Sequence, residues 1–96
     1  MPPVKPRARE GLTVVELDGE AVIYDEDGGD LHHLNPTATI VFGLCDGTST
    51  MRQMSLDISE AFGVPAVEVE GQIRTLIRSF RKARLLEPSP NPRRRR

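Results

Sequence analysis

The first third of the chain carries short apolar runs separated by turn-forming residues, a pattern that predicts β-strands. The runs Leu12–Leu17, Ala21–Tyr24 and Leu31–Leu34 are rich in strand-forming residues. Asp18-Gly19 lies between the first two runs, and glycine accepts the positive φ that a tight hairpin turn requires. A polar turn at Asp25–Asp30 separates the second run from the third. We therefore predict an antiparallel meander of three strands.

After the third strand the apolar spacing becomes helical. Asn35 is suited to cap a helix, and Pro36 is suited to the first helical position, where no N–H is required. A first helix is therefore expected from Pro36 to about Cys45. The segment Thr50–Gln53 has the form of a capping box, in which threonine and glutamine satisfy each other's backbone N–H groups. It predicts a second helix that stops at Gly63.

The third predicted helix is the longest and runs from Pro65 to about Ala83. Its apolar residues repeat at helical spacing and form one stripe: Val69, Ile73, Leu76, Ile77 and Phe80. Leu85-Leu86 should then fold back on the core. Three strands followed by three helices make an α+β domain, winged-helix-like in content, with its three-stranded antiparallel sheet placed first.

The length of 96 residues fits one domain with short tails. Residues 1–9 contain three prolines and no apolar periodicity, so we expect a flexible N-terminal segment. Residues 10–87 form the predicted domain, and residues 88–96 are expected to be a disordered Pro/Arg tail. No run approaches the roughly 20 apolar residues that span a bilayer, and no secretory signal is visible. The sequence thus predicts a soluble cytoplasmic protein without membrane association.

The distribution of charge limits the possible partners. All fourteen acidic residues lie between residues 10 and 87, against six basic ones, so this body has a net charge of −8. A negative surface opposes general nucleic-acid binding, which depends on displacing counterions from phosphates. Basic residues on the third predicted helix, Arg74, Arg78 and Arg81, nevertheless keep a winged-helix DNA-binding protein as the alternative function.

Two short motifs flank the first predicted helix and suggest a family. Leu34-Asn35-Pro36-Thr37-Ala38 opens this helix, and Leu44-Cys45-Asp46-Gly47-Thr48 closes it. At this spacing the two motifs resemble the PqqD-like family, the peptide chaperones of the pyrroloquinoline quinone type, also called RiPP recognition elements. The resemblance covers about residues 10–87, and it offers no account of the arginine-rich tail.

The resemblance implies a binding function rather than catalysis. Its members bind the leader segment of a ribosomally synthesised precursor peptide by strand addition. They then present the leader to a separate maturation enzyme, such as a radical S-adenosylmethionine enzyme, a protease or a cyclase. The implied peptide-binding residues are Leu31, His32, His33 and Leu34 on the edge strand and Val69, Ile73, Arg74, Leu76, Ile77 and Phe80 on the third helix. The resemblance names neither the precursor nor the enzyme.

Elementary strand geometry supports this mode of binding independently. The third strand of a meander has one side with unpaired N–H and C=O groups, which is a template for an added strand. Adjacent histidines on a strand point to opposite faces, so His32 and His33 should not share a metal ion. Because the strand register is undetermined, either histidine could face the groove. Cys45 is expected to pack as a small hydrophobic residue, and we predict no catalytic site, metal site or cofactor.

Overall fold

Short turns connect the three strands of an antiparallel sheet, as predicted. The computed structural model describes residues 5–87, and its strands are β1 (Leu12–Leu17), β2 (Glu20–Asp25) and β3 (Leu31–Leu34), in the spatial order β1-β2-β3. Asp18 and Gly19 have φ values of 56° and 81°, which allow a two-residue turn between β1 and β2. The three helices are α1 (Pro36–Gly43), α2 (Met51–Phe62) and α3 (Ala66–Lys82).

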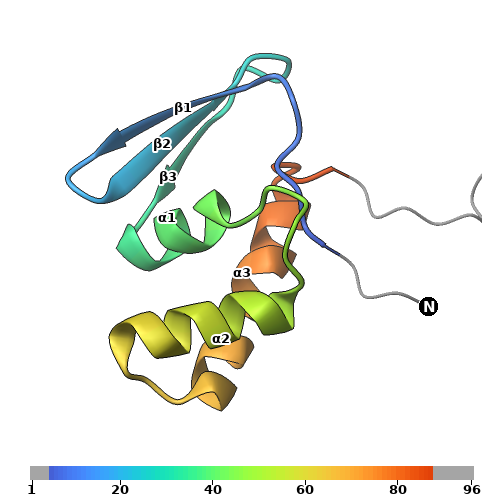
Figure 1. Ribbon diagram of the computed structural model, residues 1–96. Helices are drawn as coiled ribbons and strands as arrows, with labels where there is room; N and C mark the ends of the chain where they lie inside the picture. Colours follow the sequence, from blue (N-terminus) through green and yellow to red (C-terminus); the bar gives the residue numbers. More distant parts are fainter. Residues whose placement is uncertain (1–4, 88–96) are drawn as a thin grey trace, which may run out of the picture.

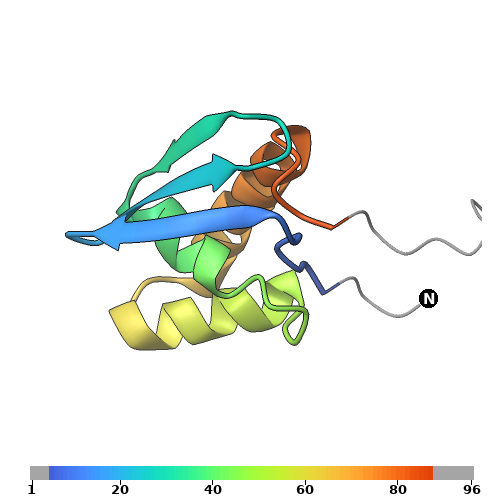
Figure 2. The same ribbon diagram turned by 90° about the horizontal axis from the view of Figure 1, so that it is seen from above.

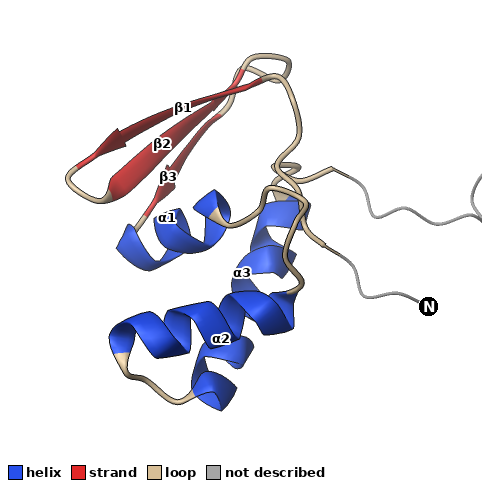
Figure 3. Cartoon of the chain, in the orientation of Figure 1, coloured by secondary structure: helices blue, strands red, loops and turns tan. Residues whose placement is uncertain are grey.

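The strands and helices form two layers (Figure 1). Helix α1 lies against β2 and β3, and α2 packs on α3, so the helices cover one face of the sheet (Figures 2 and 3). This arrangement confirms the predicted α+β fold of three strands followed by three helices. The β1–β2 hairpin projects beyond the helices in Figure 1, and every residue of β1 except Leu12 is exposed.

Side-chain caps begin the first two helices where the sequence predicts them. The Ala38 N–H donates to Asn35 Oδ1 at 2.8 Å, and Thr50 and Gln53 form both bonds of the capping box. Helix α1 ends at Gly43, earlier than expected, because the next turn tightens. There the Cys45 N–H donates to the Phe42 carbonyl, three residues back, at 3.0 Å.

The core lies between the sheet and the helices. Its most completely buried apolar side chains are Ile23, Met54, Ile73, Ile77, Leu85 and Val41. Leu85 and Leu86 are 1% and 5% exposed, which confirms that the chain folds back on the core after α3. No helix within the described part of the chain has the length and apolar character needed to cross a membrane.

The end of the segment predicted to be flexible packs on the domain. The Ala8 N–H donates to the Cys45 carbonyl, and the Glu87 N–H donates to the Arg7 carbonyl, each at 2.8 Å. Residues 5–9 therefore run between the end of α1 and the segment after α3. Single backbone hydrogen bonds between distant segments produce no periodic pattern in the sequence, so these contacts were not predicted. The remaining tail predictions, for residues 1–4 and 88–96, lie outside the described residues.

Asp25 connects this N-terminal segment to the turn between β2 and β3. Its buried carboxylate lies 2.7 Å from Arg9 Nη2 and accepts the N–H groups of Asp27 and Gly28 at 3.0 and 3.1 Å. The Arg9 hydrogen bond, followed by the Gly28 N–H, holds the pKa of Asp25 below its ordinary value of 3.8. The ionised carboxylate therefore organises the turn that precedes β3.

We predict that Asp25→Asn destabilises the domain at neutral pH and much less in acid. Because the folded-state pKa is lowered, the carboxylate stabilises the fold above pH 3.8, and this contribution is lost as the pH falls through the folded-state value. The Tm difference between wild type and variant should shrink between about pH 7 and about pH 3. Asp27→Asn, at an exposed carboxylate 3.5 Å from Arg9, is the control and should have a smaller effect. A Tm difference independent of pH would contradict this role for Asp25.

Candidate functional site

The backbone hydrogen bonds of β2 determine which amides of β3 are free. The Asp25 N–H donates toward the β3 side, to the Asp30 carbonyl at 2.9 Å. The Glu26 N–H donates to the opposite side, to the Gly11 carbonyl at 3.1 Å. Because amide directions alternate along a strand, odd-numbered residues of β2 face β3 and even-numbered residues face β1.

This alternation orients the two histidines of β3. His32 pairs with Ile23, an odd-numbered residue, so its N–H and C=O groups point toward β2. His33 pairs with Val22, and Leu31 pairs with Tyr24, so the backbone groups of His33 and Leu31 point away from the sheet. Within the described residues, β3 has β2 as its one strand neighbour, so these groups form an open edge.

The histidine side chains point to opposite faces, as predicted. His32 shares a face with the fully buried Ile23 and therefore points toward the helices. His33 shares the other face with Val22 and is exposed, and its Nε2 lies 2.8 Å from Glu20 Oε1. Metal binding by the pair would require them to converge. No group of three or more His, Cys, Asp or Glu side chains in residues 5–87 is placed to hold a metal ion.

A groove of about 450 Å³ lies between β3 and α3. All four residues of β3 line it, together with Asn35, Ala38 and Leu85. The wall contributed by the third helix and its end consists of Leu76, Ser79, Phe80 and Ala83. Leu76 and Phe80 are four residues apart, as are Ser79 and Ala83, so these side chains lie on neighbouring parts of one face. An extended segment beside β3 would have its backbone at the open edge and half of its side chains in this groove.

The structure divides the predicted α3 residues into three groups. Leu76 and Phe80 line the groove. Val69, Ile73 and Ile77 are between 1% and 6% exposed and pack in the core. Arg74 is two residues from Leu76, hence about 200° around the helix, and it lies 3.4 Å from Glu70 instead.

Two groove residues, Ser79 and Ala83, carried no sequence signal. Small side chains contribute to the depth of a groove but do not add to an apolar periodicity. A search for small residues one turn from an apolar stripe could have found them.

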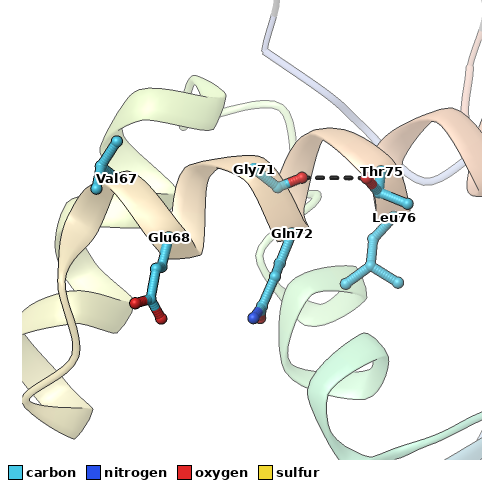
Figure 4. A pocket seen from close by; sticks show the side chains of 6 residues that line it. All are labelled: Val67, Glu68, Gly71, Gln72, Thr75 and Leu76. Carbon is cyan, nitrogen blue, oxygen red and sulfur yellow. Dashed lines mark hydrogen bonds between the residues drawn. The ribbon is translucent and has the colours of Figure 1, made fainter.

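A second hollow, of about 550 Å³, continues along α3 toward its N-terminus. Figure 4 shows its lining residues, Val67, Glu68, Gly71, Gln72, Thr75 and Leu76. The dashed line in that figure is the bond from Thr75 Oγ1 to the Gly71 carbonyl, at 3.1 Å. Leu76 lines both this space and the groove beside β3.

His32 and Cys45 each carry a polar side-chain atom that is buried. His32 Nε2 is buried and has no hydrogen-bond partner among the described residues. The Cys45 thiol is also buried and donates to the Val41 carbonyl at 3.3 Å. Burial, followed by the charge of Asp46, raises the pKa of Cys45 to about 12, so the thiol stays protonated at neutral pH. The structure thus confirms Cys45 as a small packed side chain.

Comparison with known proteins identifies related sequences and folds. The model of a family described as coenzyme PQQ synthesis protein D (PqqD) matches residues 20–86. A solved structure of TbiB1 in complex with the TbiA(beta) leader peptide is 18% identical, with a TM-score of 0.77. A lasso peptide synthetase B1 complexed with its leader peptide is 20% identical, with a TM-score of 0.76. Both alignments cover 88% of this chain and 99% of the other. No curated protein matches the chain.

We predict that His32→Leu stabilises the domain by about 1 kcal/mol, because it removes a buried nitrogen that lacks a hydrogen-bond partner. Urea unfolding at neutral pH measures this change. His33→Leu is the control at the exposed neighbouring position and should alter stability by less than about 0.5 kcal/mol. A clear loss of stability in His32→Leu would show that the imidazole makes a favourable polar interaction.

Proposed function

The chain belongs to the PqqD family, and on that basis we propose that it binds the leader segment of a ribosomally synthesised precursor peptide and presents it to a separate modifying enzyme. One observation carries the proposal: the open edge of β3 borders a groove formed with α3. Two solved structures with the same fold are described as leader-peptide complexes. These complexes support a peptide ligand for this chain.

In the proposed complex the leader pairs with β3 as a fourth strand. Leu31 and His33 each offer one N–H donor and one C=O acceptor to it. These main-chain bonds tolerate many leader sequences. Selectivity comes from the leader side chains that enter the groove, where they contact Leu76 and Phe80.

The magnitudes indicate that the groove decides the affinity. Four main-chain hydrogen bonds at about 0.5–1.5 kcal/mol each contribute about 2–6 kcal/mol. Association costs about 4–15 kcal/mol in lost translational and rotational freedom. The edge alone therefore does not retain a leader, and apolar contacts in the groove must supply the remainder. Such a balance suits a chaperone that has to release its peptide.

The chemistry in this proposal belongs to the partner enzyme. We assign no catalytic residue and no cofactor to the chain itself, consistent with the protonated Cys45 thiol. A radical S-adenosylmethionine enzyme, a protease or a cyclase would each be a suitable partner. Ribosomal precursors are made in the cytoplasm, which is therefore the proposed location.

The alternative of DNA binding gains no support from the family or from the two similar structures. Between residues 10 and 34 the chain has eight acidic residues and no lysine or arginine. A β-hairpin of this charge would be repelled by phosphates. Among the arginines of α3, Arg74 already lies close to Glu70.

We predict that His33→Pro abolishes strand addition while the domain stays folded. Proline lacks the N–H that His33 directs to the open edge, and its ring occupies the position of the leader backbone. Leader affinity, measured by fluorescence polarisation, should fall at least about tenfold. Circular dichroism should show an intact fold.

Two further variants separate backbone from side-chain effects. His33→Ala keeps the N–H and should change the leader affinity by less than about threefold. His32→Pro removes an N–H directed to β2 and should instead destabilise the fold. Normal leader binding by a folded His33→Pro variant would exclude strand addition at this edge.

We also predict that Leu76→Ala weakens leader binding by about tenfold, because it removes apolar surface from the groove wall. Arg74→Ala is the matched control on the same helix, since Arg74 lies outside the groove. Equal losses in the two variants would indicate a general perturbation of α3 rather than contact in the groove. Isothermal titration calorimetry with the precursor leader provides the measurement.

A further inference from the structure

The face of the sheet opposite the helices is uncovered and carries large apolar side chains beside the Glu20–His33 ion pair. The register places five large apolar side chains on it: Val15 and Leu17 of β1, Val22 and Tyr24 of β2, and Leu31 of β3. Their exposed fractions range from 38% to 73%. We call these five residues the outer face. Large exposed apolar side chains gathered on one face of three strands are typical of a protein interaction site.

Acidic residues lie at both ends of the outer face. Asp18 lies in the turn at one end of the hairpin, and Glu26 and Asp30 lie in the turn at the other end. They belong to the segment 10–34, which has eight acidic residues and no lysine or arginine. A complementary partner has an apolar centre and a basic rim. A second copy of this chain would instead place like charges against each other.

We propose that the outer face is the docking surface for the modifying enzyme, through an apolar patch of that enzyme rimmed by lysine and arginine. This inference rests on the proposed function, since it names the surface by which the leader-bound chain reaches its partner. On β2 and β3 the opposite face of the sheet is occupied by the core and the leader groove, so the enzyme cannot reach it there.

The outer face is continuous with the edge at which the leader is proposed to bind. Leu31 contributes its side chain to the outer face and its backbone N–H to the open edge. A strand added beside β3 would direct every second side chain to the same side as Leu31. The bound leader thereby enlarges the docking surface, and the enzyme should bind the leader-loaded chain more tightly than the empty chain.

The test uses a double variant on β1, the strand farthest from the leader edge. Val15→Thr with Leu17→Thr keeps strand-forming residues and removes apolar surface from two exposed positions. Leu56→Gln is the matched control, because Leu56 is an equally prominent apolar residue, 51% exposed, on α2. Asp30→Lys reverses one rim charge and leaves the apolar residues intact. The probes are a fluorescent leader peptide and the purified enzyme that modifies the same precursor.

The double variant should retain leader affinity within about twofold and lose enzyme affinity by at least about tenfold. Asp30→Lys should weaken enzyme binding at low salt, and less so at about 0.5 M salt, where charges are screened. Leu56→Gln should change neither affinity. For wild type, the enzyme should bind the loaded chain several-fold more tightly.

The possible failures are distinguishable. A wild-type chain that does not bind the leader would refute the proposed function. Normal leader binding, combined with enzyme binding that is insensitive to both the double variant and Asp30→Lys, would refute the docking surface alone. Equal enzyme affinity for loaded and empty chain would show that the leader adds nothing to the contact.

Discussion

The pairing of β2 with β3 is the constraint on which the rest of the site depends. Side chains alternate between faces and amides alternate between edges, so one register fixes both. With His32 opposite Ile23, one imidazole lies on the groove side and the neighbouring residue offers its backbone to the open edge. A slip by one residue would exchange these roles. The turn at Asp25 holds the register, because this residue binds both the Asp30 carbonyl and Arg9. The buried carboxylate of Asp25 thus holds the turn that leads from β2 into β3.

Local signals in the sequence predicted most of the fold, because they act over a few residues. The Asn35 cap, the Thr50–Gln53 capping box and the Asp18-Gly19 turn each involve neighbours in the chain, and each appears as expected. Interactions between distant segments were not predictable in this way. Arg9 reaches Asp25 and, through its backbone, Leu85, and nothing in the composition of residues 1–9 indicates these contacts. The orientation of the histidines depends on the register of β2 and β3, which no local signal determines, and so remained open at the sequence level.

The predicted helix residues show why a stripe on a helix does not by itself define a binding surface. The core and the groove occupy adjacent faces of α3, and they share Phe80, which is buried and lies in edge-to-face contact with Phe42. Ile73 and Ile77 supply the core, and this burial keeps the helix in place. Ser79 and Ala83 lie on the face of α3 next to the core face, and their small side chains leave room for the groove. Apolar periodicity along α3 therefore indicates the core face and does not by itself indicate the groove face.

The charge of the sheet opposes pairing between copies of the chain through its two open edges. Strand β1 is six residues long with Glu16 as its one charged side chain, and such an edge favours self-pairing. Strand β3 has four residues and is protected partly by its shortness. The eight acidic residues of segment 10–34, without a compensating lysine or arginine, make every sheet-to-sheet encounter between copies an encounter of like charges. Repulsion of this kind acts at a distance and does not block the backbone. The charge of segment 10–34 therefore favours an added strand without net negative charge at the edge of β3. Repulsion would act on an acidic strand before any hydrogen bond could form.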